Sequence, residues 1–498
     1  MSAKVRLNRY EAIGEVDKRI YSGFIEHLGR AVYSGIFQPG HASADEDGFR
    51  RDVLELVRML DMPLTRYPGG NFVSAYRWED GIGPVEKRPA RLDYAWKAIE
   101  PNTFGLDEFM KWCRKAKTEP IMAVNLGTRG ASEAMDLAEY CNFKGGTYWS
   151  DLRKQNGAEA PYNIRYWCLG NEMDGPWQAG HTTARAYGAL AREAGKLIRG
   201  ISPEAEFIVC GSSSAEIKTF PEWDREVLEE TYEIADFIAL HRYFANDRGT
   251  AEFLTAPEKM ASQIETIVCT CDYVKALKRS AKTIDLSFDE WNIWFRSKGK
   301  DKNSSSEWTV GRDILEDIYT MEDALVCGGL LCTLQNHCDR VKIACLAQTV
   351  NVIAPIMTSR EGGAWKQTIF YPFLYASRYG RGVALKMNIE SGSYECGGRN
   401  YPYLVGSAIL NEDRGELTVF AVNRNLEAPL PLKVTLENLN AEKILEFVSL
   451  HHADLLAENR EHEEKVRPEI RTDAVAENGT VSAMLPAASW NMIRVKIL

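Results

Sequence analysis

Two glutamates occupy comparable places in the stretches LGNEMDGPW (169–177) and LSFDEWN (286–292). Glu172 follows the apolar, strand-like run IRYWC (164–168), and Glu290 lies at the end of a second apolar run. If both runs are parallel strands of one barrel, the two carboxyl groups face each other across its mouth. Such a pair is suited to glycoside hydrolysis, in which one carboxylic acid protonates the leaving oxygen and the other carboxylate attacks the anomeric carbon or activates water.

Either glutamate alone would be interpreted as a solvated surface residue, because most glutamates are exposed. The interpretation changes for a pair at strand ends with tryptophans nearby in the sequence, namely Trp177, Trp291 and Trp294. The pattern therefore favours a functional site over two unrelated surface carboxylates.

The elements that must position this pair are eight strand-like runs, each followed by a stretch with helical periodicity. The runs span residues 21–29, 62–71, 120–128, 164–172, 206–213, 237–243, 284–292 and 343–351. One of the helices is expected to begin after Thr183, which can cap it, and to end before Pro203. Alternating strands and helices predict an α/β fold with a parallel sheet, and eight units fit a (β/α)8 TIM barrel.

A doubly wound open sheet is the competing fold, and the positions of the polar residues decide between the two. Nearly every strand-like run carries a chemically competent residue at its carboxyl end, the face at which barrels place their active sites. These residues are Glu26, Arg66, Asn125, Asn171, Glu172, His241, Glu290 and Gln348. An open sheet would gather them at one switch point, and the usual Gly-rich nucleotide signatures do not follow any of the runs.

The pattern changes after about residue 385, where short, partly alternating runs are separated by turn residues. Such runs at 416–424, 431–438, 444–451, 479–486 and 489–498 predict a jelly-roll-like β-sandwich. The run at 3–8 is expected to add an edge strand to this sandwich, and the charged stretch 457–470 is expected to be an exposed loop. The predicted division is therefore an N-terminal strand region (1–17), a catalytic barrel (18–385) and a C-terminal β-sandwich (386–498).

The composition limits the classes of molecule that the protein is expected to bind. The chain has 498 residues and a formal net charge of −10, which argues against nucleic-acid binding because phosphates require clustered Lys and Arg. No window approaches the roughly 18 uninterrupted apolar residues of a membrane span, and no secretory signal is evident, so a cytoplasmic protein is expected. The eleven cysteines lack paired spacings and are expected to be reduced. We expect neither a metal nor a cofactor, since His241 has no partner at ligand spacing.

The chain resembles the α-L-arabinofuranosidases of glycoside hydrolase family 51 over essentially its whole length. The motifs that carry the likeness are FIEHLGRAVYSGIF, RYPGGNFVSAYRWEDGIGP, MAVNLGTRG, WCLGNEMDGPWQ, LSFDEWN, LAQTVNVIAPIMT and ASWNMIRV. The resemblance implies a barrel with a C-terminal β-sandwich, a retaining mechanism, no catalytic metal and a homohexamer.

The resemblance also implies roles for individual residues. Glu172 matches the general acid/base and Glu290 the nucleophile of the family. Three residues match positions around the family's nucleophile, namely Arg66, His241 and Tyr243. Four match positions that contact the arabinose hydroxyls, namely Glu26, Asn71, Asn171 and Gln348, and two match aromatic residues of the pocket, namely Trp96 and Trp294. The segment 244–246 departs from the Tyr-Gly pair of many relatives, so the shape of that loop is not implied.

The function that follows is that of an exo-acting enzyme removing terminal arabinofuranose from arabinan- or arabinoxylan-derived oligosaccharides. Short substrates are expected because polymers stay outside a cell. An endo-β-glucanase, which the same family contains, is a second hypothesis and would need an open cleft. A non-catalytic carbohydrate-binding protein is a third, although such a protein has no need of both Glu172 and Glu290.

Overall fold

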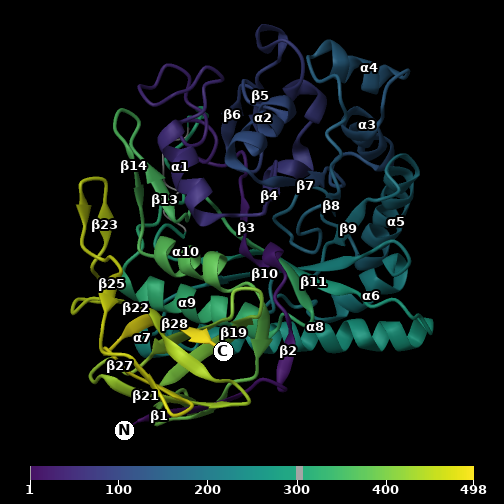
Figure 1. Ribbon diagram of the computed structural model, residues 1–498. Helices are drawn as coiled ribbons and strands as arrows, with labels where there is room; N and C mark the ends of the chain where they lie inside the picture. Colours follow the sequence, from purple (N-terminus) through teal and green to yellow (C-terminus); the bar gives the residue numbers. More distant parts are fainter. Residues whose placement is uncertain (1, 299–306) are drawn as a thin grey trace.

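Eight parallel strands close into a barrel in chain order, with helices around them (Figure 1). The computed structural model describes residues 2–298 and 307–498. The barrel strands are β3 (Ser22–Phe24), β4 (Leu64–Tyr67), β7 (Glu119–Val124), β8 (Tyr166–Leu169), β9 (Glu206–Val209), β10 (Phe237–Phe244), β11 (Asp285–Ile293) and β12 (Val341–Leu346). Each of the eight predicted strand-like runs overlaps one of them, so the (β/α)8 barrel is confirmed.

Two apolar layers hold the barrel together. Its interior is filled by a cluster that includes Phe24, Ile121, Cys168, Ile208 and Ile343, because alternate residues of a strand face the same side. The outer faces of the strands pack against helices. These are α1 (Arg51–Leu60), α2 (Leu106–Ala116), α3 (Ala131–Asn142), α4 (Tyr148–Gln155), α5 (Ala184–Ile201), α6 (Glu222–Thr231), α7 (Thr250–Phe253), α8 (Ala256–Lys278), α9 (Met321–Asn336) and α10 (Phe370–Tyr379).

Helix α5 begins where the sequence predicts. The Thr183 side chain accepts a hydrogen bond from the backbone N–H of Ala186 at 3.3 Å, which satisfies one of the free donors at the helix start. The buried face of the helix includes Tyr187, Ala191 and Ile198. The three- and four-residue spacing of apolar residues therefore identified both the helix and its buried side.

Helix α9 joins the barrel to the β-sandwich. Every residue from Met321 to Gln335 is buried, because the helix contacts barrel strand β11 on one side and the sandwich strands on the other. Gly328 permits this close approach, since a Cβ atom there would lie 2.1 Å from Cδ1 of Trp490. Trp490 belongs to the same buried cluster as the barrel helices, so the main apolar core extends into the interface between the two units.

Two sheets form the C-terminal β-sandwich around a separate apolar core. The larger sheet contains, in order, β2 (Ala12–Glu15), β15 (Val383–Leu385), β19 (Leu404–Asn411), β20 (Glu416–Asn423), β28 (Ser489–Ile497), β22 (Ala441–His451) and β25 (Glu469–Arg471). The smaller contains β16 (Asn388–Glu390), β1 (Ala3–Asn8), β21 (Leu430–Glu437), β27 (Thr480–Leu485) and β26 (Val475–Glu477). All five predicted C-terminal runs are strands, and the predicted sandwich is confirmed.

The N-terminal strand joins the sandwich, but not at an edge. Strand β1 pairs in parallel with β21 on one side and antiparallel with β16 on the other. The expectation of an edge strand was wrong because the three-residue β16 was too short to be recognised in the sequence. Strand β15 also pairs within the larger sandwich sheet. The division of the chain at residues 17 and 385 stays a prediction.

The charged stretch 457–470 is not simply an exposed loop, which corrects the prediction. It contains a small hairpin, β23 (Asn459–Arg460) and β24 (Glu463–Glu464), and the start of β25. The buried Asn459 side chain closes it with two hydrogen bonds of 2.8 Å to the backbone of Val466. Glu461 at its turn accepts hydrogen bonds from the Ser359 hydroxyl and the Gly363 N–H. Glu461 therefore ties the hairpin to the barrel unit, whereas Arg460 pairs with Glu458 within the stretch, so charge density alone misled.

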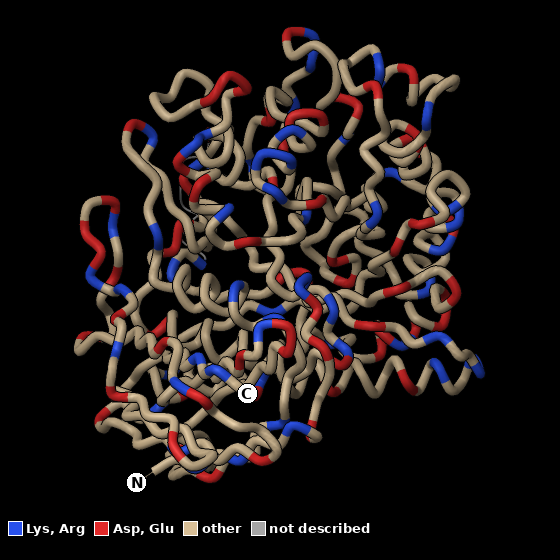
Figure 2. The backbone as a smooth tube through the Cα atoms, viewed as in Figure 1, with Lys and Arg blue, Asp and Glu red and all other residues tan. Residues whose placement is uncertain are grey.

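Three further hairpins lie outside these layers, namely β5 (Arg91–Asp93) with β6 (Ala98–Glu100), β13 (Ile356–Thr358) with β14 (Ala364–Lys366), and β17 (Ser393–Cys396) with β18 (Arg399–Pro402). The described residues also form the 3-10 helices η1 (Lys18–Tyr21), η2 (Asn71–Ala75), η3 (Trp78–Gly81) and η4 (Val85–Lys87). Figure 2 shows acidic and basic residues interspersed along the chain in this view. Within the described ranges, no helix combines the length and the apolar composition needed to cross a bilayer.

Candidate active site

Glu172 and Glu290 converge at the carboxyl end of the barrel. Glu172 lies in the loop after β8, and Glu290 lies in β11, three strands further around the barrel. A carboxylate oxygen of each glutamate and a ring nitrogen of His241 all lie within 4.8 Å of one another. The side chains are 11% and 7% exposed. The two carboxyl groups that the sequence places at strand ends are therefore close neighbours in a nearly dry setting.

The loop LGNEMDGPW is shaped to present Glu172. The backbone of Glu172 adopts φ of +44°, a left-handed conformation that costs a non-glycine residue of order 1 kcal/mol and persists where its surroundings impose it. Two residues further on, Asp174 Oδ2 accepts hydrogen bonds from the backbone N–H and hydroxyl of Ser213 at 2.9 and 3.1 Å. The Trp177 indole donates to Glu172 Oε2 at 2.7 Å. Asp174 thus ties this loop to the loop after β9.

Glu290 receives two short hydrogen bonds. Arg66 Nη1 donates to its Oε1 at 2.6 Å and the Tyr243 hydroxyl donates to its Oε2 at 2.8 Å. Burial and the negative charge of Glu290 raise the pKa of Tyr243 well above its usual value, so the phenol keeps the proton that it donates. An acceptor with two such donors is held in one orientation.

A third buried acid, Asp289, lies beneath the pair and was missed by the sequence reasoning. Its Oδ2 lies 3.3 Å from Arg66 Nε and its Oδ1 lies 3.2 Å from His241 Nε2. Burial alone would raise the pKa of Asp289, but Arg66 and His241 outweigh burial and lower it. The pairing of β11 with β12 shifts register between Phe288 and Trp291, and such irregularities bend a strand and redirect its side chains. The feature of the sequence that could have identified Asp289 is the presence of an acidic residue inside the apolar run LSFDEWN.

His241 connects this acid to Glu172. Its Nδ1 lies 2.9 Å from Glu172 Oε1 and 3.6 Å from Glu290 Oε2. Burial opposes a charge on the imidazole, but Glu290, Asp289 and Glu172 together raise the pKa of His241 well above its usual value. The ring is therefore a cation that lies between the side chains of Glu172 and Asp289.

Glu172, His241 and Glu290 could also be considered as a set of metal ligands, since their donor atoms cluster. The chemistry of the set does not fit a metal. A metal requires a neutral imidazole, whereas the carboxylates around His241 favour its protonated form, and Arg66 already occupies one oxygen of Glu290.

Glu26 forms the next wall of the site. Its Oε1 accepts hydrogen bonds from the Phe72 N–H at 3.0 Å and the Trp96 indole at 2.9 Å, and its Oε2 accepts one from Gln348 Nε2 at 3.2 Å. Burial, together with the nearby charge of Glu290, raises the pKa of Glu26 to about 8. Glu26 is accordingly uncharged at neutral pH.

The remaining residues singled out in the sequence mostly meet here. Asn171 accepts a hydrogen bond from Arg66 Nη2 at 2.7 Å and donates to Asn71 at 3.4 Å. The Trp294 ring meets the Tyr243 ring edge-on, with centroids 5.6 Å apart. Asn125, at the end of the third barrel strand, instead organises its own loop through bonds to backbone groups and Thr128.

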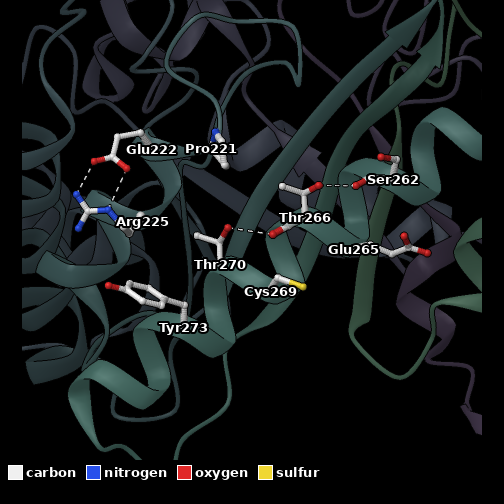
Figure 3. A pocket seen from close by; sticks show the side chains of 9 residues that line it. All are labelled: Pro221, Glu222, Arg225, Ser262, Glu265, Thr266, Cys269, Thr270 and Tyr273. Carbon is white, nitrogen blue, oxygen red and sulfur yellow. Dashed lines mark hydrogen bonds and ion pairs between the residues drawn. The ribbon is translucent and has the colours of Figure 1, made fainter.

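Other hollows do not share this chemistry. A groove of about 630 Å³ lies between α6 and α8 on the outside of the barrel (Figure 3). Thr266 and Thr270 donate to carbonyls one helical turn earlier, and Arg225 pairs with Glu222. These polar groups already have hydrogen-bond or ion-pair partners within the groove. The carboxyl ends of the barrel strands therefore remain the candidate active site. The segment 244–246, in which the sequence departs from the Tyr-Gly pair of many relatives, ends in Asn246. The side-chain amide of Asn246 donates a hydrogen bond to Glu322 at 3.0 Å.

An eight-stranded parallel barrel with two buried carboxyl groups this close at its carboxyl end defines a glycoside hydrolase. The comparisons with known proteins give the family. Residues 56–261 match a family model described as the α-L-arabinofuranosidase 1 domain, and residues 289–489 match one described as the α-L-arabinofuranosidase C-terminal domain. The chain belongs to the α-L-arabinofuranosidases of glycoside hydrolase family 51.

Individual relatives match over nearly the full chain. An intracellular exo-α-(1→5)-L-arabinofuranosidase of Acetivibrio thermocellus is 50% identical, with 99% of both chains covered. An exo-α-(1→6)-L-arabinofuranosidase of Bifidobacterium longum is 44% identical over 97% of this chain and 95% of the relative. The solved structure of a family 51 α-L-arabinofuranosidase from Bifidobacterium longum superimposes with a TM-score of 0.95 at 41% identity, covering 99% of each chain. An arabinose complex from Thermotoga maritima gives a TM-score of 0.87 at 32% identity, covering 99% of this chain and 100% of that one.

Proposed function

We propose that this family 51 enzyme is a retaining, exo-acting α-L-arabinofuranosidase that releases terminal non-reducing arabinofuranosyl residues from arabinan- and arabinoxylan-derived oligosaccharides. The observation that carries the proposal is the approach of Glu172 and Glu290 to within 4.8 Å. Retaining pairs stand about 5–5.5 Å apart, whereas inverting pairs stand roughly 6.5–9.5 Å apart to admit a water molecule. The separation leaves room for direct attack on the sugar.

The division of labour follows from the hydrogen bonds. Glu290, oriented by Arg66 and Tyr243, attacks the anomeric carbon while Glu172 protonates the departing glycosidic oxygen. This step forms the bond from Glu290 to the sugar and breaks the bond to the aglycone. Glu172 then takes a proton from water, whose oxygen displaces Glu290 and restores the free enzyme.

Charge balance explains why Glu172 is the acid. Three buried carboxyl groups, Glu172, Asp289 and Glu290, share the centre with two cations, Arg66 and His241. A buried cluster is costly unless its charges are matched, so one carboxyl group must hold a proton. Arg66 contacts Asp289 and Glu290, so the role of the acid falls to Glu172. When Glu290 becomes an ester, it loses its charge, and the ionised Glu172 then balances the centre.

The polar walls suit a small sugar with several hydroxyl groups. Glu26, Asn71, Asn171 and Gln348 place donors and acceptors around the centre, and buried groups of this kind reject sugars that leave them unpaired. Trp96 and Trp294 supply apolar faces. We assign these residues, with Arg66, His241 and Tyr243, to binding of the arabinofuranosyl unit.

The names of relatives support two refinements. Relatives from Acetivibrio thermocellus and Bacillus subtilis, each 50% identical, are called intracellular exo-α-(1→5)-L-arabinofuranosidases. We assign this chain the same 1→5 preference and a cytoplasmic location, which cell fractionation and a comparison of linkage-defined disaccharides would test. The homohexamer implied by the resemblance stays a prediction, for which light scattering should give six times the chain mass.

The deciding experiment is hydrolysis of an aryl α-L-arabinofuranoside by the wild type and by Glu290→Ala. Loss of the nucleophile should lower kcat by roughly 10⁴-fold or more. Proton NMR of the first product should show retained configuration. An inert wild type would exclude the furanoside activity.

Two other measurements separate the alternatives. A rapid fall in the viscosity of a soluble β-glucan would indicate an endo-glucanase instead. Sugar binding in calorimetry without turnover of any glycoside would indicate a non-catalytic protein. Arabinan hydrolysed as fast as arabinotriose would count against the preference for short substrates.

A further inference from the structure

The tip of the β5–β6 hairpin is held by charged side chains from two directions. On one side, Asp93 Oδ1 accepts hydrogen bonds from the N–H groups of Ala95 and Trp96 at 2.9 and 3.4 Å. On the other, Arg312 Nη1 donates to the carbonyls of Trp96 and Lys97 at 3.0 and 3.2 Å. An anion thus satisfies the donors of the tip, and a cation satisfies its acceptors.

Arg312 reaches the hairpin from a well-anchored segment far along the chain. Arg360 Nη2 donates to the carbonyl of the neighbouring Gly311 at 3.0 Å, and the N–H of Ile353 donates to the Leu315 carbonyl at 2.8 Å. The segment also pairs with the hairpin, because the Ile99 N–H donates to the Thr309 carbonyl at 3.2 Å. The Arg312 side chain therefore extends from a hydrogen-bonded segment to the tip of the hairpin.

The tip needs such support. Strands of three residues form a hairpin that is marginal by itself, and its Leu92 and Tyr94 side chains are 70% and 66% exposed, so they contribute little packing. Lys97 adopts φ of +52°, a conformation that a residue with a side chain seldom takes without external constraint. The hairpin nevertheless carries Trp96, whose indole donates to Glu26 Oε1 at 2.9 Å.

We propose that Arg312 is a positioning residue that fixes Trp96 against Glu26 and so sets the wall of the pocket for the terminal sugar. The inference rests on the proposed function and adds a residue outside the sugar-binding set. Among its described hydrogen bonds, Arg312 reaches the tip backbone and neither Glu172 nor Glu290. Its removal should therefore weaken substrate binding and leave bond cleavage nearly intact.

The test compares Arg312→Met, which keeps the length of the stem and removes its donors, with the wild type. We expect KM for an aryl α-L-arabinofuranoside to rise about tenfold, as the loss of charged hydrogen bonds produces, with kcat within about twofold. Arg312→Lys, which retains one charged donor, should recover part of the KM. Arg378→Met is the matched control, because Arg378 also donates to a backbone carbonyl, that of Met59, but lies away from the hairpin and from the segment that carries Arg312.

A double-mutant cycle distinguishes positioning of Trp96 from a general structural role. In Trp96→Ala the side chain that Arg312 positions is gone, so adding Arg312→Met should raise KM little further. Full multiplication of the two effects, or an unchanged KM in Arg312→Met, would overturn the inference. If circular dichroism shows that Arg312→Met is unfolded, Arg312→Lys takes its place in the same cycle. An inactive wild type overturns the proposed function itself, whereas an active wild type with unaffected variants overturns this inference alone.

Discussion

The catalytic centre and the hairpin wall are built in different ways. The centre (Arg66, Glu172, His241, Asp289 and Glu290) lies on barrel strands or directly at their ends, and its side chains contact one another. The hairpin wall, residues 91–100 with Arg312, lies outside the barrel strands, and there side chains hold backbone groups. In the centre the contacts set protonation, whereas in the wall they set position.

This difference predicts which kinetic quantity each region controls. Changes in the centre alter the charges that the reaction uses, so they should lower kcat and move its pH dependence. Changes in the wall displace a surface that the sugar touches in ground state and transition state alike, so they should raise KM.

After loss of the nucleophile, the largest effect should come from Glu172→Ala. Without the acid, hydrolysis of an arabino-oligosaccharide should fall by roughly 10³-fold or more, since the leaving alkoxide needs a proton. Formation of the intermediate from a dinitrophenyl arabinofuranoside should fall far less, because that leaving group departs as an anion. Stopped-flow measurement of the first turnover would show the contrast. Equal losses on both substrates would remove Glu172 from the role of acid.

Asp289→Asn should have the next largest effect, with kcat lowered by about 10²-fold. Asp289 is one of the carboxylates that raise the pKa of His241, so its loss lowers that pKa and moves the alkaline limb of the kcat profile to lower pH. Ser287→Ala is the matched control, as its buried hydroxyl in the same strand has no hydrogen-bond partner. A profile that keeps the position of the wild-type limb would contradict the role given to Asp289.

The sequence predicted the centre better than the wall, and the reason is physical. Glu172, His241 and Glu290 follow from the strand period and from the rule that barrels place function at strand ends. Asp289 was missed because ideal alternation would point it away from Glu290, and the register shift in β11 is not visible in the sequence. The contact of Arg312 with Trp96 joins loops 216 residues apart, and no periodicity records such a contact.

Glu26 lies where the two regions meet and should show a smaller, pH-dependent effect. Its pKa of about 8 is raised by burial and Glu290, so it is neutral below pH 8 and gains a charge above it. We expect kcat/KM to fall by about tenfold above pH 8. Glu26→Gln mimics the neutral acid and should keep most of the activity at pH 7 while abolishing this limb. A Glu26→Gln profile with the same fall above pH 8 would assign the limb to another group.

Asp93→Asn should have the smallest effect on activity. Its effect on thermal stability tests whether the hairpin wall depends on a buried charge as the catalytic centre does. Asparagine can still accept the two backbone hydrogen bonds at the tip, so KM should stay within about twofold. Burial raises the pKa of Asp93 to about 7. A carboxyl group with a raised folded-state pKa contributes stability that is lost as the pH rises from its unfolded value through 7. Asp93→Asn should therefore raise Tm at pH 8 by roughly 2 °C, a gain that fades toward pH 4. A lower Tm at pH 8 would mean that the wall, like the centre, depends on its buried negative charge.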